Sequence, residues 1–160
     1  MYDSGQYYNA NKNGFSYCAI FVDWLFYHQA GNNAEEAKKV KPYNLYNPSV
    51  YWSYKAYFDV ERTGSLPKVG ASIFFKTKDG KEMWAHTGIV SKVNADTIET
   101  IEGNVSNNVV SKTYSINDPI IICYGYPFYE EEPEPQPEDW ETIAEWQDID
   151  GKNLRLQKHK

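Results

Sequence analysis

Residues 16–24 carry the sequence SYCAIFVDW, which places a single cysteine, Cys18, at the start of an amphipathic helix. Ser16 precedes it and is of a residue type that commonly forms a helix N-cap. From residue 19 onward apolar residues recur at intervals of three and four, the period of an α-helix, and Gly31 is typical of a helix end. The pattern predicts one helix from Tyr17 to Ala30.

Two later stretches place polar side chains on neighbouring strands. His86 lies in WAHTGIV and Glu102 in TIEGN. These two β-type stretches flank a predicted turn formed by residues 94–96, Asn-Ala-Asp. In a hairpin centred near Asn94, His86 and Glu102 lie opposite one another or nearly so, with Cβ atoms about 5 Å apart. Asn104 has the same parity as Glu102 and therefore shares its face of the strand.

The second half of the chain is rich in short β-branched stretches that turn residues separate. Five strands are predicted, over residues 71–76, 84–93, 97–102, 109–114 and 120–126. Short helices are predicted over residues 34–39 and 49–59. Helices first and hairpin-linked strands afterwards predict an α+β fold, in which N-terminal helices pack on an antiparallel sheet of about five strands.

Residues 43–58 are unusually aromatic, and two interpretations fit them. The aromatic side chains either pack against the sheet, which the sequence favours, or form one wall of a substrate groove. The set comprises Tyr43, Tyr46, Tyr51, Trp52, Tyr54, Tyr57 and Phe58.

The net charge of −6 belongs entirely to the end of the chain. Residues 1–129 hold 12 Lys/Arg and 12 Asp/Glu, whereas residues 130–160 hold 4 Lys/Arg and 10 Asp/Glu. The chain therefore lacks the basic surface that is typical of a nucleic-acid-binding protein. No apolar run approaches the roughly 18 residues of a membrane helix. We expect neither a nucleic acid nor a membrane as partner.

A Pro/Glu-rich linker is predicted over residues 130–139, where the chain should be extended and solvated. It separates a domain of residues 1–129 from a tail of residues 140–160. The tail shows apolar residues at helical spacing, at Trp140, Ile143 and Trp146. Because it is too short to fold alone, we interpret it as a docking tail or as the truncated start of a second module.

The two cysteines of the chain, Cys18 and Cys123, lie in different environments. One disulfide between them is compatible with export, but we favour two free thiols. Cys123 lies in the apolar run PIIICY, where a thiol behaves as a small hydrophobe. Cys18 lies in the first turn of its helix, where unpaired amides and the helix dipole favour negative charge and lower a thiol pKa.

A cysteine nucleophile needs a base, and His86 is the best candidate among the three histidines. His28 lies about 15 Å along the helix from Cys18, and His159 belongs to the tail. Glu102 can accept a hydrogen bond from one ring nitrogen of His86 and leave the other facing the thiol. Together these three groups would form a nucleophilic triad.

Other polar groups could complete such a site. Asn104 could replace Glu102 in orienting the histidine, or support the polar network. The amide of Cys18 is a natural oxyanion donor, and the side chain of Asn11 or Asn13 could supply a second. Each triad member also has a structural interpretation: a core thiol, a strand histidine and a surface carboxylate.

Taken in order, these motifs resemble the CHAP domain, a family of papain-like cysteine amidases and peptidases from bacterial and phage cell-wall hydrolases. The family is related to the NlpC-type peptidases. The resemblance covers about residues 6–128 and implies a papain-like fold, with residues 1–129 as the catalytic domain. It rests on YCAxFVxW at residues 17–24, PKVGxxIFF at 67–75, AHTGIVxKV at 85–93, TIEGN at 100–104 and YGYP at 124–127.

The resemblance implies roles for four residues. Cys18 is the nucleophile, His86 the base, Glu102 the third member of the triad and Asn104 a fourth active-site residue. The implied substrate is the peptide part of peptidoglycan, cut at the N-acetylmuramoyl–L-alanine amide or within the stem peptide or cross-bridge. The acidic linker further resembles prophage endolysins of Gram-positive gut bacteria.

The chain departs from the family pattern in three places. Tyr17 stands where many relatives have Trp, and Ala71 stands where Asp commonly follows Pro-x-x-Gly. The helix that usually precedes the cysteine motif is absent or compressed into the first 17 residues. The alternatives to a hydrolase are therefore a wall-binding module of the same fold without turnover, and another thiol reaction such as that of an antibacterial effector.

No loop of the Asp-rich calcium-binding type occurs, so we predict no metal and no cofactor. We expect a monomer that acts on peptidoglycan in the cell wall, outside the cytoplasm. The first residues, MYDSG, carry no positive charge and lead into no apolar stretch, unlike a secretory signal. We therefore expect phage-type release, or a fragment of a longer exported protein.

Overall fold

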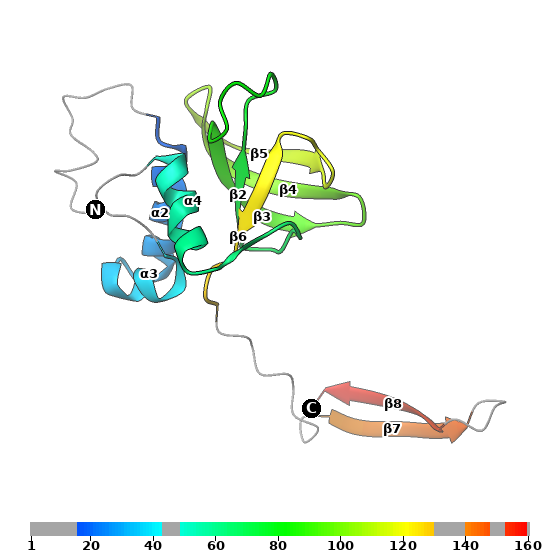
Figure 1. The fold of residues 1–160 in the computed structure, drawn as a ribbon. Coiled ribbons are helices and arrows are strands. Elements are labelled where there is room, and N and C mark those ends of the chain that lie inside the picture. Colours follow the sequence, from blue (N-terminus) through cyan, green and yellow to red (C-terminus); the bar gives the residue numbers. More distant parts are fainter. Residues whose placement is uncertain (1–15, 43–48, 130–139, 148–152, 160) are drawn as a thin grey trace. The chain divides into compact units, whose positions relative to one another are not determined.

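The computed structural model describes residues 16–42, 49–129, 140–147 and 153–159. The chain divides into two compact units, Met1–Phe128 and Tyr129–Lys160. Figure 1 shows the helices of the described residues, all of which belong to the first unit. They are α2 (Cys18–Gln29), α3 (Ala34–Val40) and α4 (Val50–Asp59).

Helix α2 begins at Cys18, and its N-cap is Tyr17, which makes no side-chain capping bond. The prediction that Ser16 is the N-cap is therefore wrong. The Ser16 hydroxyl is engaged elsewhere, because it lies 3.7 Å from the Cys18 sulfur and accepts a hydrogen bond of 3.1 Å from Asn104 Nδ2. At the other end, Gly31 adopts a left-handed φ of 66°, which confirms the predicted end of the helix.

The two shorter helices begin where a side chain can cap them. Asn33 accepts hydrogen bonds from the amides of Glu35 and Glu36 at the start of α3. Ser49 accepts one from the amide of Trp52 at the start of α4. Each cap satisfies amide groups that have no partner within the helix. Both short helices are confirmed.

The strands of the first unit form one antiparallel sheet, which confirms the α+β fold (Figure 1). The order is β1-β6-β2-β3-β4-β5, so the sheet has six strands rather than about five. The unpredicted strand, β1, spans only two residues and is too short to show a periodic pattern. The bounds are β1 (Thr63–Gly64), β2 (Ser72–Phe75), β3 (His86–Val93), β4 (Thr97–Val105), β5 (Asn108–Ser115) and β6 (Ile121–Gly125).

The pairing of β3 with β4 corrects the predicted hairpin. Val90 pairs with Thr100, a register that puts Gly88, rather than His86, level with Glu102. A β-bulge just after Val90 shifts the register, and a regular hairpin has no such extra residue. His86 and Glu102 therefore meet diagonally across the two strands, on one face of the sheet.

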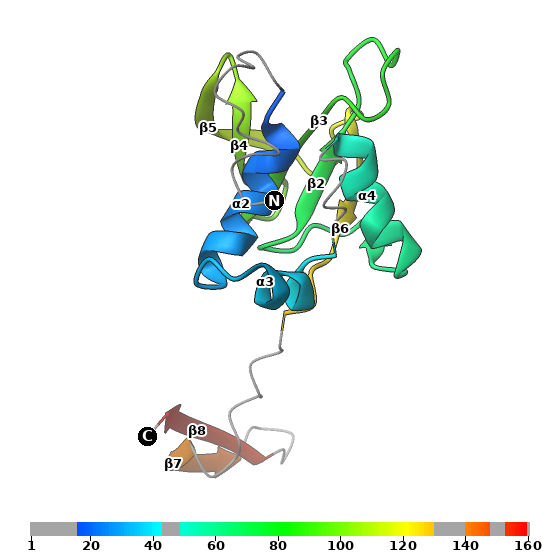
Figure 2. The same cartoon turned by 90° about the vertical axis from the view of Figure 1, so that its left-hand side faces the viewer.

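Apolar side chains cover both faces of β2. Phe74 packs in one cluster, while its neighbours Ile73 and Phe75 pack in another, because successive strand residues point to opposite faces. The helices lie on one side of the sheet in both ribbon views (Figures 1 and 2). The cluster on this helical side contains Cys18, Ala19, Val50, Tyr57 and Phe74.

Helix α2 approaches β4 closely at Gly103, which has no side chain. A Cβ atom at Gly103 would lie 2.6 Å from the Cβ atom of Phe21 on α2, nearer than real Cβ atoms come. The glycine therefore allows the cysteine-bearing helix to rest directly on the strand that carries Glu102.

A buried ion pair ties α2 to the end of α3. Lys41 Nζ lies 2.7 Å from Asp23 Oδ1, and the Lys41 side chain is fully buried. Burial raises the pKa of the Asp23 carboxyl, although the positive charge of Lys41 counteracts part of this effect. Removing one member of such a pair costs about 3–5 kcal/mol, so the pair helps to fix α2 in place.

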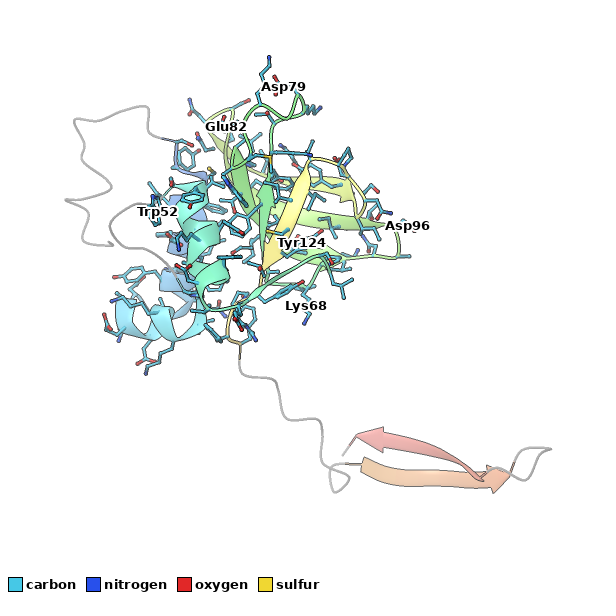
Figure 3. The ribbon with its side chains drawn as sticks, viewed as in Figure 1. Trp52, Lys68, Asp79, Glu82, Asp96 and Tyr124 are labelled. Atoms are coloured by element: carbon cyan, nitrogen blue, oxygen red, sulfur yellow. The ribbon has the colours of Figure 1, made fainter. Side chains whose placement is uncertain are left out.

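The loop between β2 and β3 lies at one end of the sheet (Figure 3). Figure 3 shows Asp79 and Glu82 on this loop, at the end of the sheet away from Lys68. His86 follows the loop directly, and α2 begins at the same end (Figures 1 and 2). The topology therefore brings the start of α2 and the start of β3 together.

The second unit is a two-stranded antiparallel hairpin, β7 (Trp140–Gln147) with β8 (Asn153–His159). Trp140, Ile143 and Trp146 have helical spacing in the sequence, but they lie in strand β7 and not in a helix. A β-bulge between Thr142 and Ala144 leaves Ile143 out of the pairing and alters the period of the strand. Within the ranges that the structure describes, no helix has the length and apolar character needed to cross a bilayer.

Candidate active site

Cys18 is the first residue of α2, and its side chain is almost fully buried, with 2% exposed. The first turn of the helix holds no acidic side chain and no side-chain cap. The positive end of the helix dipole therefore acts on the sulfur without a competing negative charge in that turn. This position favours the thiolate over the thiol.

His86, the first residue of β3, lies between the thiol and the carboxylate. Its Nε2 atom is 2.8 Å from Oε2 of Glu102. The ring also lies close enough to the Cys18 side chain for the two groups to shift each other's pKa. Because Nε2 interacts with Glu102, Nδ1 is the ring nitrogen that remains for the thiol. The ring stacks on Phe75 with centroids 5.9 Å apart, which fixes its plane.

Glu102 is completely buried, and several donors surround its carboxylate. Oε1 accepts a hydrogen bond of 2.7 Å from the Thr100 hydroxyl. Oε2 faces His86 and lies 3.2 Å from Lys112 Nζ, and the nearby Tyr114 side chain helps to lower the pKa of the carboxyl. A buried carboxylate with this many donors stays ionised and in a fixed orientation.

Gly88 gives the Glu102 side chain its path across the sheet. A Cβ atom at Gly88 would lie 2.7 Å from Glu102 Cγ and 2.9 Å from the Ile101 carbonyl oxygen. Only a residue without a side chain fits beneath Glu102 here. The glycine in the AHTGIV motif thus lets the carboxylate reach the histidine two residues away.

The electrostatics of the three groups favour an ion pair. Burial of the Cys18 thiol opposes ionisation, but hydrogen bonds to His86 and Ser16 lower its pKa below the ordinary value. Burial also opposes a charged His86, yet Cys18 and Glu102 raise its pKa to about 9. Burial of Glu102 is likewise outweighed, chiefly by the His86 hydrogen bond, and its pKa falls to about 2. These shifts favour a thiolate beside an imidazolium over the neutral thiol and imidazole.

Asn104 reaches the site through a residue that the sequence did not single out for chemistry. Its Nδ2 atom donates to the Ser16 hydroxyl, and that hydroxyl can donate its own hydrogen to the Cys18 sulfur 3.7 Å away. Asn104 adopts a left-handed φ of 63° at an irregularity near the end of β4. The sequence signal that could identify Ser16 is its place two residues before the cysteine.

The described aromatic residues of the segment 43–58 pack in the core and against the cluster that contains Cys18. Tyr57 is fully buried, which fits the packing interpretation. Tyr54 stacks on Trp84 with centroids 3.9 Å apart, and both are partly buried against the cluster that contains Cys18. Tyr51 is 42% exposed and lies at the Trp84 edge of this group. Tyr43 and Tyr46 lie outside the described residues.

Both cysteines are free, as predicted. Cys123 lies on β6 and has a pKa that burial raises to about 11, so it remains a thiol at neutral pH. The Cys18 amide lies at the helix start as expected of an oxyanion donor, whereas Asn11 and Asn13 lie outside the described residues. Among the described residues, no group of three or more His, Cys, Asp or Glu side chains is arranged to hold a metal.

The comparison with protein families agrees with this geometry. The family model described as the CHAP domain matches residues 8–104, a range that includes Cys18, His86, Glu102 and Asn104. The chain belongs to the CHAP domain family. CHAP domains are cysteine- and histidine-dependent amidases or peptidases, so membership indicates a peptidoglycan hydrolase that acts on the cell wall. No curated protein and no solved structure matches the chain.

Proposed function

We propose that this CHAP domain hydrolyses an amide bond in the peptide part of peptidoglycan by Cys-His-Glu catalysis. Cys18 is the nucleophile, His86 the general base and acid, and Glu102 the group that orients and charges the histidine. Asn104 acts as a fourth member, because it positions the Ser16 hydroxyl beside the sulfur.

The observation that carries the proposal is that His86 interacts with both the Cys18 thiol and the Glu102 carboxylate. His86 Nε2 lies 2.8 Å from Glu102, and Cys18 and His86 shift each other's pKa, which leaves Nδ1 as the ring nitrogen for the thiol. A histidine held on both sides in this way cannot rotate, so its Nδ1 proton stays directed at the reacting sulfur. The lowered pKa of Cys18 and the raised pKa of His86 supply the charged pair that attack and protonation require.

The reaction follows from this charge distribution. The thiolate of Cys18 attacks the amide carbonyl carbon, and the carbonyl oxygen gains negative charge near the Cys18 amide. His86 then gives its Nδ1 proton to the leaving nitrogen, and the C–N bond breaks to leave a thioester. The neutral imidazole next takes a proton from water, which attacks the thioester and releases the carboxylic acid and the sulfur.

The proposal includes two alternatives for the bond that is cut, the N-acetylmuramoyl–L-alanine amide and a bond within the stem peptide or cross-bridge. The partly buried pair Tyr54 and Trp84, with the exposed Tyr51 beside it, supports an extended peptide lying next to the nucleophile. Both kinds of substrate present such a peptide.

The test is digestion of purified sacculi by the full chain, followed by mass spectrometry of the released fragments. We expect soluble fragments from the wild type and a loss of more than about 1,000-fold in Cys18→Ala. Cys123→Ala is the matched control and should digest normally. New amino termini on L-alanine would identify an amidase, and new termini farther along the peptide would identify an endopeptidase. Wild-type chain that binds sacculi and releases nothing would reject the hydrolase in favour of a wall-binding module.

The charged pair also predicts how hydrolysis depends on pH. His86 must be protonated to release the leaving nitrogen, so the rate should fall as the pH rises through about 9. On the acid side the rate should fall as the thiolate takes up its proton, below the ordinary range of a cysteine. A rate of sacculus digestion that keeps rising above the pKa of His86 would contradict the role of the imidazolium.

A further inference from the structure

Strand β5 adds a positive charge to the site that the triad itself does not include. β5 pairs with β4 at the edge of the sheet, and Lys112 pairs with Thr100. Thr100 and Glu102 share one face of β4, so Lys112 and Tyr114 point to that same face from β5. Lys112 forms an ion pair with the Glu102 carboxylate, and Tyr114 helps to lower the pKa of that carboxyl.

Lys112 and His86 share a single oxygen atom. Lys112 Nζ lies 3.2 Å from Glu102 Oε2, and His86 Nε2 lies 2.8 Å from the same atom. The two cations are therefore no more than about 6 Å apart, a range in which like charges affect each other's protonation. Lys112 Nζ also lies 5.9 Å from the centre of the Tyr114 ring, which limits its freedom.

We propose that Lys112 is a positioning residue that holds Glu102 in place and sets the upper pH limit of the charged Cys18–His86 pair. The inference rests on the proposed function, since it assigns Lys112 to the same catalytic site. Lys112 neutralises part of the negative charge that His86 faces, so the imidazolium gives up its proton more readily than it would beside Glu102 alone.

The described groups around His86 support a specific role for Lys112. Helix α2 presents Cys18 and β4 presents Glu102, both of which favour a charged histidine when they are ionised. β2 presents the uncharged ring of Phe75. β5 presents Lys112 and Tyr114, and Tyr114 stays neutral because burial and its bond to Glu102 raise its pKa. Among these groups Lys112 is the one that opposes the charge on His86.

A second Lys–Glu pair on the same sheet supplies a matched control. Lys92 lies opposite Glu99 across β3 and β4, with Nζ 3.4 Å from Oε1. Both side chains are largely exposed, at 61% and 41%, whereas Glu102 is fully buried beside Lys112. Removing Lys92 changes the net charge of the protein as much as removing Lys112 does, but away from His86.

The experiment follows the His86 titration by NMR in the full chain, with its ring signals identified by their loss in His86→Asn. In Lys112→Met the midpoint should rise by about half to one pH unit, because a partly solvated like charge has been removed. Lys112→Arg and Lys92→Met should keep the wild-type midpoint. Lys112→Gln is a second neutral variant in case Lys112→Met does not fold. An unchanged midpoint in the neutral variants, or an equal rise in Lys92→Met, would overturn the inference.

Sacculus digestion over the same pH range tests the link to catalysis. The alkaline fall in rate should move upward together with the His86 midpoint in Lys112→Met and stay in place in Lys112→Arg. If the His86 midpoint moved and the digestion profile did not, Lys112 would not set the upper pH limit of hydrolysis, and the inference would be overturned. The titration itself needs no substrate, so wild-type chain that digests no sacculi would refute the proposed function in a separate measurement.

Discussion

The two cysteines of this protein share an apolar environment and differ in almost everything else. Cys18 belongs to the cluster on the helical side of the sheet, and Cys123 packs against that same cluster from β6. Burial opposes ionisation of both thiols, yet the pKa of Cys123 is raised to about 11 while that of Cys18 is lowered. Hydrogen-bonding partners, rather than burial, therefore decide which thiol of this chain can react.

Removing His86 should abolish most of the difference between the two cysteines. His86→Ala takes away the hydrogen bond and positive charge that outweigh the burial of Cys18, so its thiol should come to resemble Cys123. We expect hydrolysis to fall roughly 1,000-fold, the effect of losing a general acid–base. In this variant the thiolate absorbance of Cys18, taken as His86→Ala minus the double variant His86→Ala/Cys18→Ala, should appear only at alkaline pH.

His28→Ala is the control for this substitution. His28 stacks on Trp24 on the exposed face of α2. Its loss should change neither the rate of hydrolysis nor the ionisation of Cys18. If His86→Ala left the thiolate at neutral pH, Ser16 and the helix dipole, without His86, would account for the difference between the two cysteines.

A smaller effect is expected from substitution of Glu102, which is hydrogen-bonded to His86. Glu102→Gln keeps the shape of the side chain but removes the charge that helps to raise the pKa of His86. We expect hydrolysis to fall roughly 100-fold, because the imidazolium is less stable and less well oriented. The alkaline limb of the pH–rate profile should move below about 9. Glu99→Gln, in the exposed pair with Lys92, should leave the rate and profile unchanged.

The convergence of the three reactive groups could be predicted because each lies in a strong local pattern. The helical period with Gly31 predicts α2, and Cys18 falls at its start whichever residue forms the cap. Alternating strands joined by a short turn place His86 and Glu102 on neighbouring strands. These signals concern residues close together in the chain, where periodicity and turn chemistry are informative.

The details that set the chemistry could not be predicted, because they depend on contacts between distant residues. The bulge after Val90 moves the register, and Gly88 rather than His86 becomes level with Glu102. Strand parity puts Lys112 on one face of β5, but only the β4–β5 register brings it to the carboxylate. In the tail, spacings of three residues fit either a helix or a bulged strand, and the bulge at Ile143 decides for the strand.

Gly88→Ala tests whether catalysis by Cys18 depends on the close approach of Glu102 to Gly88, which lies level with it on β3. The new Cβ atom would meet Glu102 Cγ at 2.7 Å and the Ile101 carbonyl at 2.9 Å, and the carbonyl belongs to the backbone and cannot easily move away. We expect a loss of about 1–3 kcal/mol in the free energy of unfolding. Displacement of Glu102 should lower hydrolysis by roughly 10-fold, since small misplacements of catalytic groups are costly. Urea unfolding and sacculus digestion measure the two effects, and an unchanged rate would show that Glu102 reaches His86 by another path.

The smallest effect should come from the other cysteine. Cys123→Ala removes a partly buried thiol that behaves as a small hydrophobe, so the free energy of unfolding should fall by about 1 kcal/mol. Hydrolysis and the ionisation of Cys18 should stay as in the wild type, because neither His86 nor Ser16 is touched. Cys123 faces Phe74 across β6 and β2, and Phe74 packs with Cys18, so any coupling between the thiols would pass through this shared cluster. A tenfold loss of rate without a matching loss of stability would show such coupling, and the two cysteines could then no longer be treated as independent.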